Sequence, residues 1–256
     1  MIGIVRLVVR TALSLACVFL IIIMMSVTWS LGCRRTTRAI MQGAFIFGAW
    51  VWGIHIRTSG TLAKGRPLIV VSNHFTYLDL FVLGSHIPAA FTPKSEIRSW
   101  PVIGLMCLVS GCLFIDRRSS QTLDNKQRLQ AALAAGDIIS LFPEGTTNDG
   151  TGLQKFKSSF FSLAEESAVE VQPVSIVYTA LDDNPLNAAS RPVIGWYGDS
   201  EFFPHAAHYL QQKSVRAELV FHSPVRASDF ASRKELALHC QSVIEKPLQK
   251  MIESLR

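Results

Sequence analysis

The sequence predicts an α/β protein with a mostly parallel central sheet flanked by helices, preceded by an N-terminal membrane helix and an interfacial or re-entrant helix. Three observations lead to this prediction. An uncharged apolar run fills residues 11–33. From about residue 58 onward, short apolar segments alternate with helical segments, which is typical of a layered α/β fold. Polar side chains follow several apolar segments directly, and ligands of open α/β sheets gather at the carboxyl ends of strands.

The N-terminal apolar run is long enough to cross a membrane. It extends from Thr11 to Cys33 without a charged residue, and at about 1.5 Å per residue it covers a hydrocarbon core of roughly 30 Å. A cleavable signal peptide has a shorter apolar region and a small-residue cleavage site, and this run has neither. We therefore expect single-pass or monotopic attachment to the cell membrane, which is the inner membrane in a bacterium. The arginines on either side favour a cytoplasmic C-terminal part: Arg6 and Arg10 before it, and Arg34, Arg35 and Arg38 after it.

A second apolar stretch, residues 39–54, is shorter and interrupted by glycines. Its tryptophans and phenylalanines suit the membrane interface, where amphipathic rings settle, so an interfacial or re-entrant helix is predicted. A core helix of the following domain is the alternative. The chain accordingly divides into a membrane-anchoring segment, residues 1–57, and a single domain, residues 58–256.

The elements of the domain follow from apolar runs and their boundaries. Continuous apolar runs predict strands buried on both faces, whereas amphipathic segments that end in glycine or begin with a capping residue predict helices. Ser232 and Glu235 form a capping box that opens the last helix, and Pro247 kinks or ends it. The expected strands are 67–72, 89–94, 111–117, 137–145, 169–178 and 216–225, and the expected helices are 77–87, 122–136, 157–167 and 232–246.

The net charge of +6 favours anionic partners. Nucleic acid is not predicted, because the chain has no basic patch interleaved with aromatic residues and no binding motif. A basic face beside a membrane anchor attracts anionic lipid headgroups or anionic substrates instead. The histidines of HAAH, residues 205–208, have no partner ligands nearby, so no metal is predicted. The cysteines lack the spacing of a redox or zinc motif and indicate a reducing compartment: Cys17, Cys33, Cys107, Cys112 and Cys240.

The first candidate site is the pair His74 and Asp79, at the point where the strand 67–72 ends. A histidine at such a place is commonly a structural residue. An aspartate five positions later can instead bond one ring nitrogen, fix the tautomer and leave the other nitrogen free as a base. Because no G-x-S-x-G motif supplies a nucleophilic serine, the base is expected to act directly on a substrate hydroxyl.

Two further strand ends carry charged groups. Glu144 lies at the end of the predicted strand 137–145, in LFPEGTTNDG, where it can hold a hydroxyl or orient a base, although a plain turn is the simpler interpretation. Gly145 beside it permits close approach of the backbone. The arginines of GCLFIDRR, Arg117 and Arg118, match phosphate geometry, although a solvated loop is the commoner explanation. Additional positive charge near these loops comes from Lys94, Lys155 and Lys157.

Taken together, these segments resemble the glycerolipid acyltransferase family, whose best-known members acylate lysophosphatidic acid. NHFTYLD resembles its N-H-x4-D motif and GCLFIDRR its G-x-x-F-I-x-R motif. FPEGT resembles its F-P-E-G-T motif, and VQPVSIVY its later V-x-P-V-x-I strand. The order and spacing match from about residue 60 to residue 180, and the residues after that are unmatched.

The resemblance implies a membrane-bound O-acyltransferase that needs no metal and no cofactor. His74, oriented by Asp79, would deprotonate the hydroxyl of a membrane lipid acceptor. That hydroxyl would attack the thioester of acyl-coenzyme A or acyl carrier protein. Orientation and charge stabilisation would come from the protein. The motifs place substrate-binding roles on Asn73, Arg117, Glu144, Gly145 and Thr146, with further headgroup or donor contacts from Lys94, Arg118, Lys155 and Lys157.

The chain departs from the family pattern at Thr147, where phosphate-binding members usually carry arginine. Losing a guanidinium removes a bidentate phosphate contact. Either other basic residues bind the phosphate of lysophosphatidate, which we expect first, or the acceptor is a lyso-ornithine lipid, as in relatives with similar EGTT-DG segments. Two other classes compete with these: a membrane-anchored hydrolase, which lacks a nucleophile or metal here, and a non-catalytic lipid-binding protein, which would not need the His74–Asp79 pair.

Overall fold

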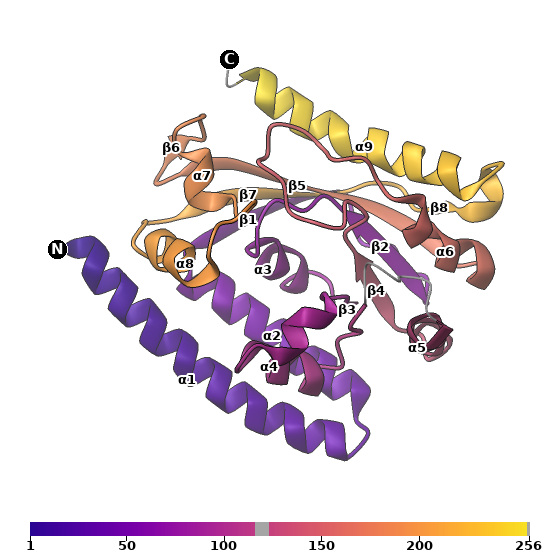
Figure 1. The fold of residues 1–256 in the computed structure, drawn as a ribbon, viewed down its shortest axis with the longest axis horizontal. Helices are drawn as coiled ribbons and strands as arrows, with labels where there is room; N and C mark the ends of the chain where they lie inside the picture. Colours follow the sequence, from indigo (N-terminus) through magenta and orange to yellow (C-terminus); the bar gives the residue numbers. More distant parts are fainter. Residues whose placement is uncertain (116–122, 255–256) are drawn as a thin grey trace.

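The computed structural model describes residues 1–115 and 123–254, in which a single sheet has helices on both faces (Figure 1). One face carries α9, and the other carries α2, α3 and α4. Alternate residues of the central strand supply two separate hydrophobic cores, because successive side chains of a strand point to opposite faces. Leu68 and Val70 belong to the core under α3, whereas Ile69 and Val71 belong to the core under α9.

The sheet is mixed but mostly parallel, as predicted. Along the sheet the strands follow the order β1-β7-β5-β2-β4-β3, and β6 and β8 pair with β5. The pairs β1–β7, β5–β2, β2–β4 and β4–β3 are parallel, and the pairs of β5 with β6, β7 and β8 are antiparallel. The strands are β1 (Ile54–Ser59), β2 (Leu68–Ser72), β3 (Ala89–Phe91), β4 (Ile138–Leu141), β5 (Glu170–Leu181), β6 (Asn184–Pro185), β7 (Val215–Phe221) and β8 (Val225–Arg226).

The helices include several that the sequence patterns did not indicate, among them α4 and α8. Short 3-10 turns occupy Ser95–Ser99, Ser158–Phe161 and Ala227–Asp229. The helices are α1 (Ile2–Ser30), α2 (Arg34–Val51), α3 (Asp79–Gly84), α4 (Ile103–Val109), α5 (Leu123–Ala134), α6 (Ser162–Ser167), α7 (Arg191–Ile194), α8 (Phe202–Leu210) and α9 (Arg233–Ser254).

Three predicted elements differ from the structure. Residues 111–115 of the expected strand 111–117 form no strand, only an isolated bridge between Ile115 and Lys94, and residues 116–117 lie outside the described part. An apolar run in a loop under a core looks the same in sequence as a buried strand. Pro247 does not end α9, which continues through it to Ser254. β1 runs across the predicted division between residues 57 and 58.

The N-terminal helix α1 is apolar and long enough to span a membrane from Ile2 to Thr28, by length and composition. Three of its polar residues, spaced four apart on one face, are bonded to the rest of the protein. The Arg10 guanidinium donates to the carbonyls of Leu210, Gln212 and Lys213 at the end of α8. Arg6 donates to the Gln211 carbonyl, and the Ser14 hydroxyl accepts from the Trp52 indole.

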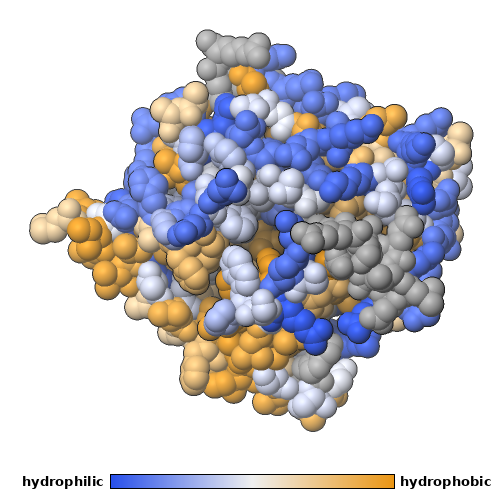
Figure 2. All heavy atoms as spheres, in the orientation of Figure 1, coloured by the Kyte–Doolittle hydropathy of each residue, from blue (hydrophilic) through white to orange (hydrophobic). Residues whose placement is uncertain are grey.

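The remaining surface of α1 and the neighbouring part of α2 expose large apolar side chains. Figure 2 shows hydrophobic residues gathered on the side of the molecule where Figure 1 has α1 and α2. Helix α1 is therefore two-sided: a polar stripe binds the domain, and an apolar surface faces outward. The residues of this outward surface include Val5, Val8, Val9, Phe19, Leu20, Ile23, Ile46, Phe47 and Trp50.

Candidate active site

The predicted pair His74 and Asp79 is in direct contact. The Nδ1 atom of His74 lies 2.8 Å from Oδ2 of Asp79. Because a carboxylate can only accept, this contact requires a hydrogen on Nδ1 and leaves Nε2 as the basic nitrogen. Within residues 1–115 and 123–254 no hydrogen bond to Nε2 is found, and the His74 side chain is 14% exposed. The ring stacks on Phe142 with centroids 3.9 Å apart, which holds its plane.

Asp79 is anchored by its own turn. It is the first residue of α3, and its Oδ2 atom accepts the backbone N–H groups of Phe75 at 2.7 Å and Thr76 at 3.0 Å. A carboxylate at a helix N-terminus is also favoured by the helix dipole. Its Oδ1 atom accepts a bond from the Tyr178 hydroxyl at 2.8 Å. The carboxylate is fully buried with four donors around it, so its orientation toward His74 is fixed.

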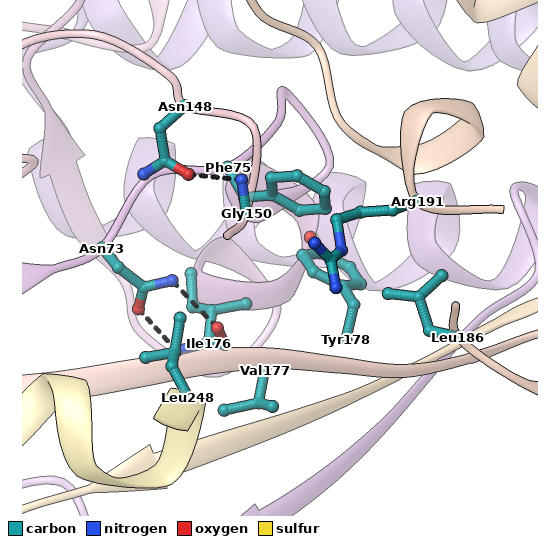
Figure 3. A pocket seen from close by; sticks show the side chains of 10 residues that line it. All are labelled: Asn73, Phe75, Asn148, Gly150, Ile176, Val177, Tyr178, Leu186, Arg191 and Leu248. Atoms are coloured by element: carbon teal, nitrogen blue, oxygen red, sulfur yellow. Dashed lines mark hydrogen bonds between the residues drawn. The ribbon is translucent and has the colours of Figure 1, made fainter. Parts of the chain in front are cut away.

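Asn73 joins the turn to the centre of the sheet. The backbone pairing of β2 with β5 ends at Ser72, and beyond it the Asn73 side chain bonds the backbone of β5. Its Nδ2 donates to the Ile176 carbonyl at 2.9 Å, and its Oδ1 accepts from the Ile176 N–H at 2.8 Å. Figure 3 shows these two bonds beside Tyr178. This contact is structural, and the predicted contact of Asn73 with substrate stays a prediction.

Glu144 bonds the backbone of His74 rather than its ring. Its Oε1 atom accepts the backbone N–H of His74 at 2.7 Å. Its Oε2 atom accepts the Gln154 N–H at 2.9 Å and the Asn148 side-chain amide at 2.5 Å. Desolvation by burial raises the pKa of Glu144 to about 7, outweighing these hydrogen bonds, which lower it. The carboxylate thus links the strand-end turn at His74 to the loop of residues 145–157.

The raised pKa of Glu144 predicts a pH-dependent stability. The shift from 4.5 to about 7 means that the folded chain holds this proton more tightly than the unfolded chain. Stability from Glu144 is therefore complete below pH 4.5 and lost as the pH rises through about 7. A shift of this size corresponds to about 3 kcal/mol. The melting temperature of the wild type should fall between pH 5 and 7.5 relative to that of Glu144→Gln. Parallel curves of melting temperature against pH for the two chains would contradict this.

The loop after Glu144 folds back over the turn. The Asn148 N–H donates to the His74 carbonyl at 3.2 Å, and its side-chain oxygen accepts the Gly150 N–H at 2.7 Å. Gly145 has φ +77°, a conformation open to glycine, and a Cβ atom there would lie 2.7 Å from the Lys157 ammonium nitrogen. Lys157 therefore lies directly against the F-P-E-G-T turn.

A small cavity lies beside the turn, and its lining includes Phe75, Tyr178 and Arg191 (Figure 3). Its volume of about 20 Å³ suits roughly one water molecule. The Arg191 side chain reaches over Phe75 and Tyr178 in this view, and its buried Nε atom has no hydrogen-bond partner in the described part of the chain. Arg191 also contributes to lowering the pKa of Asp149, after the larger effect of the bonds from Thr151.

The other predicted residues are distributed around this arrangement. Thr146 is exposed on the loop, and Lys155 is exposed further along it. Lys94 is exposed after β3, at its bridge to Ile115. Arg117 and Arg118 lie outside the described residues. Their roles stay predictions.

Sequence reasoning missed three residues of the site: Tyr178, Asn148 and Arg191. Tyr178 is the last residue of the predicted strand 169–178, and the carboxyl end of that strand is expected at the same edge of the sheet as His74. The partner that its hydroxyl would meet could not be known without the pairing of β2 with β5. Asn148 and Arg191 carry no local pattern. The ring of His205, in the HAAH segment, bonds the Tyr77 hydroxyl at 2.9 Å and the Gly195 carbonyl at 2.8 Å.

Comparison with known proteins identifies the family to which this fold and this site belong. The model of the family described as Acyltransferase matches residues 53–177. A lyso-ornithine lipid O-acyltransferase of Brucella abortus is 34% identical over 80% of this chain and 79% of its own length. The enzyme of that name from Pseudomonas aeruginosa is 35% identical over 74% and 70%, respectively. The chain therefore belongs to the acyltransferase family.

Two further similar proteins are named for another lipid. A 1-acyl-sn-glycerol-3-phosphate acyltransferase of Neisseria meningitidis is 35% identical, over 57% of this chain and 58% of its own length. The crystal structure of the 1-acyl-sn-glycerophosphate acyltransferase PlsC from Thermotoga maritima has the same fold, with a TM-score of 0.63 at 19% identity. That alignment covers 94% of this chain and 97% of the other. The protein is thus an acyltransferase of lysolipids.

Proposed function

We propose that this protein transfers a fatty acyl group from a thioester to the free hydroxyl of a membrane lysolipid, with His74 as the general base. The observation that carries the proposal is the bond of the buried Asp79 to Nδ1 of His74, which leaves Nε2 as the basic atom. General-base assistance of this kind contributes about 10²- to 10⁴-fold in rate.

The reaction follows from this tautomer. Nε2 of His74 accepts the proton of the acceptor hydroxyl as its oxygen attacks the thioester carbonyl carbon. Asp79 stabilises the imidazolium that forms, and the stacked Phe142 keeps the ring in place. When the tetrahedral intermediate collapses, the carbon–sulfur bond breaks and the thiolate takes the proton from His74. The products are the acylated lipid and free coenzyme A or acyl carrier protein, and no acyl-enzyme is formed.

We infer that the acceptor is a lyso-ornithine lipid. The two relatives named for that activity match 80% and 74% of this chain, whereas the Neisseria phosphate-lipid enzyme matches 57%. Thr147 stands where phosphate-binding members of the family usually have arginine. An ornithine headgroup carries both a carboxylate and an ammonium, and the loop offers the exposed Asp149 near Arg191. Opposite charges side by side suit such a headgroup better than a phosphate.

Lysophosphatidate remains the second candidate, and one observation favours it. The Lys157 ammonium lies against Gly145, at the turn that follows Glu144. A lysine there can bind a phosphate as a point charge without the missing arginine. Both acceptors present the same reacting hydroxyl, so the mechanism at His74 does not depend on the choice.

We also propose that α1 lies in the membrane surface facing the cytoplasm. Arg10 bonds three carbonyls of the domain, and a helix held along its length in this way suits monotopic attachment better than a crossing. The exposed apolar side chains of α1 and α2 would then enter the acyl region. The lysolipid reaches the site from the same bilayer.

One liposome experiment tests acceptor and attachment together. The purified full-length protein is mixed with phosphatidylglycerol-containing liposomes that hold lyso-ornithine lipid, lysophosphatidate or neither, and receives radiolabelled palmitoyl-coenzyme A or palmitoyl-acyl carrier protein. We expect the protein to float with all liposomes and to acylate lyso-ornithine lipid at least about tenfold faster than lysophosphatidate.

Each other outcome has its own meaning. Faster acylation of lysophosphatidate would overturn the acceptor assignment and give Lys157 the phosphate role. Free palmitate without acylated lipid would indicate the hydrolase. Flotation with no turnover of either acceptor from either donor would indicate a lipid-binding protein. A chain that stays in the soluble fraction would contradict attachment through α1.

A further inference from the structure

The two oxygens of Asp79 have different partners. Oδ2 accepts three bonds, from His74 and from the backbone of the turn. Oδ1 accepts the Tyr178 hydroxyl at 2.8 Å, and no other donor to Oδ1 is found among the described residues. Because Asp79 is fully buried and Tyr178 is 3% exposed, bulk water does not reach this oxygen in place of the hydroxyl.

Tyr178 reaches Asp79 through the geometry of β5. The two bonds between Asn73 and the Ile176 backbone tie β5 to the end of β2 just before the turn. Tyr178 lies two residues further along β5, on the same face as Ile176. Figure 3 shows its ring rising beside Phe75 and under Arg191. Burial raises the pKa of Tyr178 well above its usual value, so the hydroxyl keeps its proton and donates it.

We propose that Tyr178 is a positioning residue of the acyl transfer, acting through Asp79. The proposal rests on the proposed function of His74. Rotation about the Cβ–Cγ bond would move both carboxylate oxygens, and the Tyr178 hydroxyl adds a bond on the second oxygen that opposes it. Asp79 then keeps Oδ2 on the Nδ1–H of His74 while the imidazolium forms. Tyr178 itself touches neither substrate nor the reacting atoms.

The test is Tyr178→Phe, which removes one oxygen atom and keeps the ring. We expect kcat to fall about tenfold, as for losing one hydrogen bond to a charged group, with KM unchanged for acceptor and donor. A residue that only supports the fold would lower the apparent kcat by reducing the fraction of folded protein, and the melting temperature would fall with it. Melting temperatures of both chains are measured alongside.

Tyr77→Phe is the matched control. The Tyr77 hydroxyl is also buried and also bonds a neighbour, Nδ1 of His205, at 2.9 Å, but it does not contact Asp79. The same atom is therefore removed from the same region. We expect kcat of this variant to stay within about twofold of the wild type, because its hydrogen bond does not bear on the base.

A double-mutant cycle with Asp79→Asn shows whether Tyr178 acts through the carboxylate. If it does, adding Tyr178→Phe to Asp79→Asn should change kcat by less than about twofold, because the charged group that the hydroxyl orients is already gone. A full tenfold effect in both backgrounds would overturn the proposal. If Tyr178→Phe does not fold, Tyr178→Met replaces it, since it also removes the hydroxyl from Asp79, and the same fall in kcat is expected.

The outcomes separate this inference from the proposed function. A wild-type chain that acylates no lysolipid would overturn the proposed function, and the role of the Tyr178–Asp79 bond in that reaction would fall with it. An active wild type whose Tyr178→Phe variant matches Tyr77→Phe in kcat would overturn the role of Tyr178 alone.

Discussion

Replacing His74 with alanine is expected to lower kcat by about 10²- to 10⁴-fold, because the variant loses the general base. The fold should survive. The side chain supplies only one of the four donors to Asp79, and the backbone bonds of the turn stay in place. Radiolabelled acyl transfer measures kcat, and flotation with liposomes reports whether the variant still binds the membrane.

His55→Ala is the control for this variant. His55 is an exposed histidine on β1, on the far edge of the sheet from β3, so its removal should leave turnover near the wild-type value. Near-wild-type turnover of His74→Ala would rule out the mechanism. Equal losses in both variants would point to a general effect of the preparation rather than to the base.

Replacing Asp79 with alanine is expected to abolish turnover and also to destabilise the fold. The substitution leaves the N–H groups of Phe75 and Thr76, the Tyr178 hydroxyl and the His74 ring without their acceptor. Each buried donor left unsatisfied costs about 1–3 kcal/mol. For a chain of this size, the melting temperature should fall by more than about 5 °C. From the sequence alone, both alanine variants would be expected to keep the fold, and the structure now separates them.

Asp79→Asn distinguishes the two effects of Asp79. The amide keeps one oxygen as an acceptor, so most of the stability should return while turnover stays low, since the negative charge beside His74 is missing. Thermal unfolding and kcat are measured on the same preparations. An Asp79→Ala chain as stable as the wild type would show that the four contacts contribute little.

The sequence predicts the strands β2, β4 and β5 and the contact of His74 with Asp79, because both depend on local patterns. Continuous apolar runs mark strands buried on both faces, and a histidine five residues before an aspartate can close a turn by itself. The family resemblance rests on the same local segments. These are the parts of the site that belong to one stretch of chain.

The missed features depend on pairings between distant residues. The antiparallel pairing of β5 with β7, the bond of Asn73 to Ile176 and the bond of Tyr178 to Asp79 each join residues at least 34 positions apart. No periodicity encodes such a partner. Arg10 is a similar case, since the sequence offered it as a flanking charge of a membrane span, whereas the structure bonds it to the end of α8. The apolar pattern indicated a long helix, which the structure places at Ile2–Ser30, and it did not indicate the polar stripe within it.

The bonds to Asp79 come from the turn after β2 and from β5. Glu144 and Asn148 bond only the backbone of His74: the Glu144 carboxylate accepts its N–H, and the Asn148 N–H donates to its carbonyl. In the proposed function, the proton-accepting pair and the headgroup contacts therefore belong to separate parts of the chain. Among the described residues, 146, 147, 149, 151 and 152 make no bond to His74 or Asp79, whereas Gly150, at φ +72°, packs against Phe75. A new headgroup preference could then arise by drift in one surface loop, which offers a physical reason why phosphate and amino-acid lipids share relatives of this scaffold.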